Sequence, residues 1–199
     1  NFYQVHWHSP SENTINGVSY ALEAHFVHQL DDPALHGTLH RLAVIGLLYE
    51  LGTDSECNPT LDQFWNQFPL DKGVAQFTDA QFDFNAKLND ELAHGYYHWY
   101  GSLTTPPCTQ GVSWNLLKRK EKVCQRQLDR LKQALTRTQN GIDFNNRVIQ
   151  PLHHRVVTEN TATSAQQRQA NVETEASSAV SCGVKGGLAA TAAAILARP

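Results

Sequence analysis

Two runs of β-forming residues at the start of the chain constrain its fold more than any other feature. Apolar and polar residues alternate over residues 2–8 and again over residues 18–28. Between the runs lies Ile15-Asn16-Gly17, and an Asn-Gly pair between two alternating segments is a strong signal for a β-hairpin. We therefore expect the two runs to pair as neighbouring antiparallel strands.

The residue patterns in the middle of the chain predict further strands. Residues 41–49 form a nearly continuous apolar run, which is typical of a central strand buried on both faces. Residues 95–101 and 111–117 also have strand patterns, and a loop containing Thr104-Thr105-Pro106-Pro107 separates them. The sequence therefore predicts a mainly β fold.

Two segments have the spacing of short amphipathic helices, which we expect at the periphery of the sheet. The first follows Thr60-x-x-Gln63, which resembles a capping box, and the second covers residues 125–136. The apolar positions of the first are Leu61, Phe64, Trp65 and Phe68, and those of the second are Leu128, Leu131 and Leu135.

Length and composition favour one domain followed by a tail. The chain has 199 residues, and 41% of them are hydrophobic, which is enough for a sizeable core. No aromatic residue follows Phe144, and small and polar residues dominate from residue 158 onward. We expect a domain over residues 1–157 and a low-complexity, disordered tail over residues 158–199.

Charge and hydropathy argue against two classes of function. The formal net charge is −3, so we expect no binding of nucleic acid through bulk positive charge. The sequence has no run of about 18 apolar residues, so we expect no transmembrane span. The chain contains no methionine and opens directly on a strand pattern. We therefore expect it to be a piece of a longer protein whose N-terminal segment is missing.

The cysteines show no metal or redox motif. Cys57, Cys108, Cys124 and Cys182 have no CxxC spacing, which argues against a zinc finger or a thioredoxin-like site. Four cysteines allow three pairings, and a missing segment could supply other partners. The pairing therefore stays open at this point.

Three histidines fall in phase on the two N-terminal strands. His6 and His8 are two residues apart, so both face one side of a strand, with Val5 and Trp7 on the other. His25 has the matching phase on the next strand. Three imidazoles would then converge from two rigid strands and leave a fourth position open for water, the pattern of a catalytic zinc site. An isolated His-x-His is more often exposed or part of a core, so the third histidine is what favours a metal.

Two polar residues share the histidine faces. Gln4 precedes His6 by two residues, and Glu23 precedes His25 by two. Each could accept a hydrogen bond from an imidazole N–H and so fix the tautomer of a metal ligand. A carboxylate on an inward face is costly without a partner, so Glu23 is expected to have one.

A second interpretation of the same residues stays open. The spacing His6-x-His8-x-x-x-Glu12 also resembles the first motif of the cupins, in which two histidines and a glutamate bind iron or manganese. The glycine-rich second cupin motif does not appear in the sequence. The identity of the bound metal would separate the two interpretations.

Several blocks of the chain, in order over residues 2–157, resemble the α-class carbonic anhydrases. The segment Tyr100-Gly101-Ser102-Leu103-Thr104-Thr105-Pro106-Pro107 is among the most specific signatures of that family. The other matching blocks are residues 4–8, 11–14, 22–28, 42–46 and 112–114, and Asn145-Asn146-Arg147 through Gln150-Pro151-Leu152.

The resemblance implies a fold and an activity. The fold would be a large, twisted, mostly antiparallel sheet of ten strands with a conical zinc cavity. The activity would be the reversible hydration of carbon dioxide to bicarbonate and a proton by a zinc lyase, through zinc-bound hydroxide. A non-enzymatic carbonic-anhydrase-related binding or structural domain is the alternative within the family. The intact ligands argue against it.

The resemblance also implies roles for individual residues. His6, His8 and His25 would bind Zn²⁺, and Gln4 and Glu23 would orient them. Thr104 would accept a hydrogen bond from the hydroxide and donate one to Glu12. The carbon dioxide pocket would be formed by Val27, Val44, Leu103, Val112 and Trp114, with Thr105 on the substrate side.

The family pattern suggests an upstream partner segment and a compartment. The first third of the family domain, which carries the usual proton-shuttle histidine, has no counterpart in the chain. Secreted family members often pair a cysteine at the position of Cys108 with one in that upstream part. The resemblance therefore favours an extracellular, periplasmic or organelle-lumen location.

Overall fold

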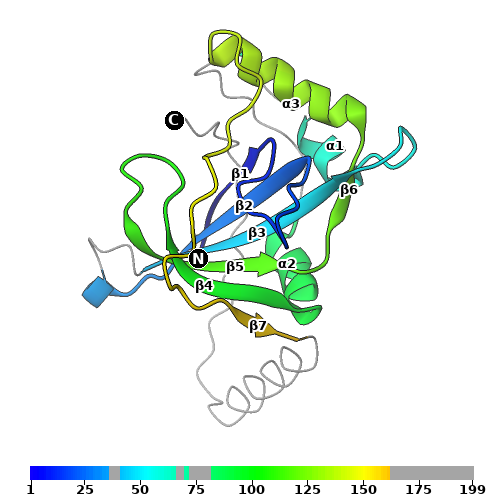
Figure 1. Cartoon of the computed structure of the whole chain (residues 1–199). Coiled ribbons are helices and arrows are strands. Elements are labelled where there is room, and N and C mark those ends of the chain that lie inside the picture. Colours follow the sequence, from blue (N-terminus) through cyan, green and yellow to red (C-terminus); the bar gives the residue numbers. More distant parts are fainter. Residues whose placement is uncertain (36–40, 66–69, 72–81, 162–199) are drawn as a thin grey trace.

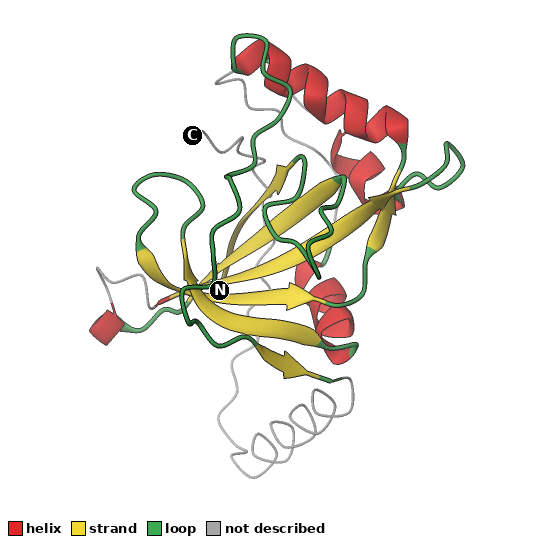
Figure 2. Ribbon diagram, viewed as in Figure 1, coloured by secondary structure: helices red, strands yellow, loops and turns green. Residues whose placement is uncertain are grey.

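A computed structural model describes residues 1–35, 41–65, 70–71 and 82–161 of the chain. These residues form a seven-stranded mixed sheet, three α-helices and a short 3₁₀ helix, which confirms the mainly β fold (Figures 1 and 2). The strands are β1 (Phe2–His8), β2 (Leu22–Gln29), β3 (Leu42–Leu51), β4 (Tyr96–Ser102), β5 (Gln110–Leu117), β6 (Glu121–Val123) and β7 (Thr158–Asn160). The helices are η1 (Pro33–Leu35), α1 (Pro59–Trp65), α2 (Phe84–Ala93) and α3 (Gln125–Thr138).

The sheet is mostly antiparallel. Its strand order is β1-β2-β3-β5-β4-β7, and β6 pairs with β3 outside this path. The pairs β1/β2, β2/β3, β4/β5 and β4/β7 are antiparallel, whereas β3 pairs in parallel with β5 and β6. The apolar run near residue 45 is the central strand, as its two-sided burial predicts.

The register of the first three strands places the histidines together. His6 of β1 lies opposite His25 of β2, and His25 lies opposite Gly46 of β3. A Cβ added at Gly46 would come within 3.0 Å of Glu23 Oε1 and 2.9 Å of the Leu116 side chain. Glycine at this position therefore leaves room for the Glu23 side chain beside His25.

The connection between β1 and β2 is longer than a tight hairpin. Asn16 and Gly17 both have positive φ and form the expected turn, closed by hydrogen bonds between Ile15 and Val18. The strand expected from residue 18 nevertheless begins only at Leu22. In the intervening stretch the Tyr20 backbone is bonded to Ser11 instead of to β1, because its N–H donates to Ser11 Oγ and its carbonyl accepts the Ser11 N–H, both at 2.9 Å.

One face of the sheet packs against the helices. Its core contains side chains from β1, β2 and β3 together with apolar residues of α1, α2 and α3. Trp7 illustrates the packing, because its ring meets Trp65 of α1 edge to face at 5.5 Å. The buried members of this core include Val5, Trp7, Phe26, Leu47, Leu61, Trp65, Phe84, Leu88, Leu131 and Leu135. The alternation of β1 thus directs Val5 and Trp7 to the helices and leaves the opposite face for the histidines.

The helices differ from expectation in two respects. Helix α1 is capped by Asn58, whose Oδ1 accepts the N–H groups of Thr60 and Leu61, rather than by the expected Thr60 box. Helix α2 was not predicted, although Asp83 caps it by accepting the Ala86 N–H. Phe68, assigned to the first helix, lies outside the described residues. None of the helices in the described ranges is long and apolar enough to cross a bilayer.

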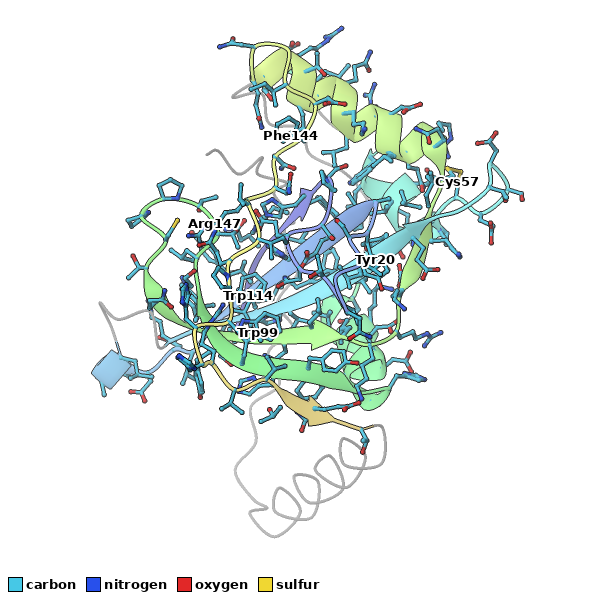
Figure 3. The ribbon with its side chains drawn as sticks, viewed as in Figure 1. Tyr20, Cys57, Trp99, Trp114, Phe144 and Arg147 are labelled. Carbon is cyan, nitrogen blue, oxygen red and sulfur yellow. A yellow bond between two sulfur atoms is a disulfide. The ribbon has the colours of Figure 1, made fainter. Side chains whose placement is uncertain are left out.

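The remaining features of the fold are a disulfide and a short last strand. Cys57 and Cys124 form a disulfide (Figure 3). Cys108 forms no disulfide with the described residues, and Cys182 lies outside the described part of the chain. Residues 158–160, which were expected to begin the disordered tail, form β7 against β4. Residues 162–199 lie beyond the described ranges, so the disorder expected there stays a prediction.

Candidate metal centre

His6, His8 and His25 converge on the face of the sheet opposite the helices. Their ring centroids are 5.0 Å apart for His6 and His8, 5.1 Å for His6 and His25, and 4.6 Å for His8 and His25. One nitrogen from each ring lies within 4.8 Å of the other two. Within the described ranges, these three residues are the one group of metal-ligating side chains that comes together in this way.

Each imidazole is held by a hydrogen-bond partner on one of its nitrogens. His6 Nδ1 lies 3.2 Å from Gln4 Oε1, and His25 Nε2 lies 3.0 Å from Glu23 Oε1. His8 Nδ1 lies 3.1 Å from the main-chain oxygen of Asn145. If each ring donates a proton to this partner, its other nitrogen keeps a free lone pair.

The residues fit a metal ion. His8 Nε2 is buried and has no hydrogen-bond partner among the described residues. A buried polar atom without a partner is costly, and a metal bond would remove that cost. Three neutral imidazoles are a donor set that suits Zn²⁺. These observations favour a metal on the free nitrogens, and the expected zinc ligands stay a prediction.

Burial and mutual repulsion keep two of the imidazoles neutral. Burial, together with the neighbouring His25 and His8, lowers the pKa of His6 from 6.5 to about 2. Burial and His25 likewise lower the pKa of His8 to about 3, although the Asn145 carbonyl acts in the opposite direction. Both rings therefore offer unprotonated nitrogen at neutral pH.

Glu23 and His25 form a buried pair in which, unlike at His6 and His8, the charged forms are favoured. Burial alone would raise the pKa of Glu23, but His25 and the hydrogen bonds from His25 and Asn13 outweigh it and lower that pKa. Burial would likewise lower the pKa of His25, but the Glu23 carboxylate raises it. Glu23 is therefore a charged acceptor that fixes the His25 ring and favours positive charge at this point.

A second carboxylate, Glu12, lies beside the histidines. Glu12 Oε1 accepts the Arg147 N–H at 2.7 Å and lies 3.4 Å from His8 Nδ1. Burial raises the pKa of Glu12, while His25, the Thr104 hydroxyl and the Arg147 N–H favour its charged form. The Thr104 side chain, far away in sequence, thus lies close enough to favour the charged form of Glu12.

The apolar residues expected near the metal form one cluster. Val27, Val44, Val112 and Trp114 are its buried members from the predicted set, and Leu103 packs against it. Leu42 and Trp99 belong to the same cluster and were not predicted. The expected place of Thr105 on the substrate side stays a prediction.

The cluster adjoins the histidines and a cavity. The Trp114 ring meets the His25 ring edge to face at 4.8 Å, and its Nε1 donates to the Ser102 carbonyl. A cavity of about 540 Å³ is lined by Glu12, Thr104 and Trp114 but by none of the three histidines. The cavity therefore approaches the histidine cluster from the side of the Glu12 carboxylate.

Two residues that contact the candidate site, Asn145 and Arg147, come from a segment for which no role was expected. Residues 139–157 run from the end of α3 past β1 to β7, and Arg147 lies on this segment (Figures 1 and 3). Asn145 contacts Trp7, His8 and Ser9, and Arg147 contacts Glu12. Their presence in a block that resembles the family was the one signal that could have identified them.

Comparisons with known proteins agree with this arrangement. A family model described as eukaryotic-type carbonic anhydrase matches residues 1–161. This chain belongs to that family. The resemblance inferred from the motifs is thereby confirmed, and neither the family nor the fold favours a cupin.

Curated carbonic anhydrases match over most of the chain. A carbonic anhydrase of Neisseria gonorrhoeae is 40% identical over 156 residues, which cover 78% of this chain and 54% of that protein. Alpha carbonic anhydrase 7 of Arabidopsis thaliana is 35% identical over 157 residues, which cover 77% of this chain and 51% of that protein. The chain thus spans about half the length of the curated carbonic anhydrases that it matches.

A solved structure shows the same fold. The α-carbonic anhydrase of Thermovibrio ammonificans, in complex with the inhibitor sulfanilamide, superposes with a TM-score of 0.64 at 33% identity. The match covers 78% of this chain and 62% of that structure. The seven described strands therefore correspond to a large part of the carbonic anhydrase sheet.

Proposed function

We propose that the protein containing this chain catalyses the reversible hydration of carbon dioxide with Zn²⁺ held by His6, His8 and His25. The observation that carries the proposal is the convergence of three imidazoles, each held on one nitrogen, with His8 Nε2 buried and unpartnered. When bound, zinc would supply a Lewis acid that lowers the pKa of a coordinated water molecule towards 7. Membership of the family supports this activity.

Thr104 and Glu12 would orient the attacking oxygen. Glu12, anchored by the Arg147 N–H, would be the acceptor for the Thr104 hydroxyl proton. With its proton directed at Glu12, the Thr104 oxygen can only accept a hydrogen bond from the nucleophile. This arrangement would turn a lone pair of the nucleophile towards the substrate carbon.

The apolar cluster would bind the substrate. Carbon dioxide is small and has no strong hydrogen-bonding group, so a pocket of valine and tryptophan side chains suits it. Trp114 lies against His25, which supports a position of this surface next to the proposed metal. Bicarbonate is charged and would bind the same apolar surface less well, which favours its release.

The test is carbon dioxide hydration by the purified, zinc-loaded chain. A strong buffer is needed because each turnover releases a proton. We expect activity that a chelator removes, that added zinc restores and that sulfanilamide inhibits. The absence of measurable hydration by a folded chain that binds zinc would contradict the proposal for this chain.

The disulfide supports a proposal about location. Disulfides persist in oxidising compartments and are rare in the cytosol. The Cys57–Cys124 bond therefore favours an extracellular, periplasmic or organelle-lumen site of action. Thiol counting on protein purified under alkylating conditions tests this, since two unreactive cysteines are expected and four reactive ones would contradict it.

A further inference from the structure

Asn145 uses all four of its polar groups on three consecutive residues of the chain around His8. Its main-chain N–H donates to the Ser9 carbonyl at 3.1 Å, and its main-chain oxygen lies 3.1 Å from His8 Nδ1. Its side-chain Oδ1 accepts the Ser9 N–H at 2.9 Å, and Nδ2 donates to the Trp7 carbonyl at 2.9 Å. Asn145 is thus bonded to the chain around His8, a proposed zinc ligand that lies 137 positions away in sequence.

The side-chain amide takes the place of a neighbouring strand. In the order of the described sheet, β1 is an edge strand that pairs only with β2. A carbonyl at one residue and the N–H two residues later point to the same edge of an extended chain. The Asn145 amide bonds this pair, at Trp7 and Ser9, and so holds the backbone on both sides of His8.

We propose that the Asn145 side chain is a positioning residue that sets the direction of His8 towards the metal. The proposal rests on the metal site proposed above. By fixing the backbone on either side of His8, the amide sets the direction of the Cα–Cβ bond. The Asn145 carbonyl then holds Nδ1, so that Nε2 is the nitrogen that faces the metal.

The adjacent asparagine provides a matched control. Asn146 has the same side chain and is also partly buried, but its side chain makes no hydrogen bond with the described residues. Asn146→Ala therefore removes an identical group from the same segment without touching β1. Asn145→Ala removes both side-chain bonds while leaving the two main-chain contacts possible.

The experiment measures metal binding rather than turnover. Zinc affinity is determined by competition with a chromophoric chelator, under conditions where urea titration shows each metal-free variant to be folded. Loss of a group that orients a metal ligand typically weakens binding by 10–100-fold. We expect at least a roughly tenfold loss for Asn145→Ala and a change of less than about twofold for Asn146→Ala.

The visible spectrum of Co²⁺ in the same site gives a second readout. It reports coordination geometry, so we expect it to change in Asn145→Ala and to match the wild type in Asn146→Ala. Wild-type affinity and an unchanged Co²⁺ spectrum in Asn145→Ala would overturn the inference. Failure of the wild-type chain itself to bind zinc would instead overturn the proposed function.

A milder variant covers the possibility that Asn145→Ala does not fold. Asn145→Ser also removes the amide but keeps a small polar group that helps to solvate the Ser9 N–H. We expect it to fold and to show the same loss of zinc affinity. If both variants are unfolded without metal, Asn145 is a general structural residue and the positioning role is wrong.

Discussion

Strands β1 and β2 contribute to both faces of the sheet, but the two faces are stabilised by different interactions. On the helix face, β1, β2 and β3 contribute Val5, Trp7, Phe26 and Leu47 to an apolar core whose stability comes from burial. On the opposite face, β1 and β2 contribute His6, His8, Glu23 and His25, whose burial is costly until each is bonded. The helix face is stabilised by the apolar side-chain volume that it buries. The histidine face depends on hydrogen bonds between particular atoms.

This difference indicates which properties a substitution on each face should affect. Removing methylene groups from the helix face should lower the free energy of unfolding and leave the metal site intact. Removing a single polar atom from the histidine face should affect metal binding or turnover more than folding. The following predictions test this separation.

The largest effect is expected from His25→Ala. It removes one of three proposed ligands and the partner of the buried Glu23 carboxylate, so we expect complete loss of bound zinc and of hydration activity. Metal analysis of dialysed protein is the measurement. His94→Ala is the control, because His94 is the C-cap of α2, and it should keep zinc. Zinc retained at full stoichiometry by His25→Ala would show that the ligand assignment is wrong.

The second prediction concerns the helix face. Leu47 is fully buried in the apolar core, so Leu47→Ala should lower the free energy of unfolding by about 3 kcal/mol. Urea titration of the metal-free protein measures this change. One zinc per chain should still bind to the folded variant. A loss of zinc affinity comparable to that of a ligand variant would show that the two faces are not independent.

Thr104→Ala should separate turnover from metal binding on the histidine face. The hydroxyl is proposed to orient the nucleophile without touching the metal, so the rate should fall about 100-fold while zinc remains bound. Hydration kinetics and metal analysis on the same sample measure both quantities. Thr109→Ala, an exposed position near the end of the same loop, should retain the wild-type rate. Equal rates for Thr104→Ala and the wild type would remove Thr104 from the mechanism.

The last prediction is a dependence of stability on pH. The pKa values of about 2 for His6 and 3 for His8 lie below the ordinary 6.5. Between about pH 6.5 and 3 the unfolded chain therefore binds protons that the metal-free native state does not. The free energy of unfolding should fall as pH falls, by at most about 1.4 kcal/mol per pH unit for each histidine.

Two variants sharpen the measurement of this pH dependence. The raised pKa of Glu12 acts in the opposite direction, so the observed slope should lie below the limit. His6→Gln should reduce the slope, whereas Leu47→Ala should lower stability equally at each pH in this range. A pH-independent free energy of unfolding would contradict the neutral state of the buried imidazoles.

The parts of the fold that follow a simple period could be predicted. The alternation of residues 2–8, the continuous apolar run near residue 45 and the leucine spacing of α3 each identified their element. Helix α2 was missed because Glu91, a charged residue, is buried on its inner side beside Phe84 and Leu88 and disguises the apolar stripe. The three residues of β7 are too few to show a period, and only pairing with β4 makes them a strand.

The candidate site divides in the same way. The phase of His6, His8 and His25 is a local property of two strands, so the sequence could indicate that they converge. The contacts of Asn145 and Arg147 depend on how a segment more than 130 residues away crosses the sheet, and no local pattern specifies that path. The disulfide is a similar case, since its 67-residue separation left several pairings equally compatible with the sequence.

The central claim is that one metal ion is held by three histidines on this face of the sheet. X-ray absorption at the zinc edge of the loaded chain tests it most directly. We predict one zinc per chain with three imidazole nitrogens at about 2.0–2.1 Å and a fourth light-atom ligand. A sulfur ligand, fewer than three imidazoles, or no stoichiometric zinc in the folded chain would contradict the account.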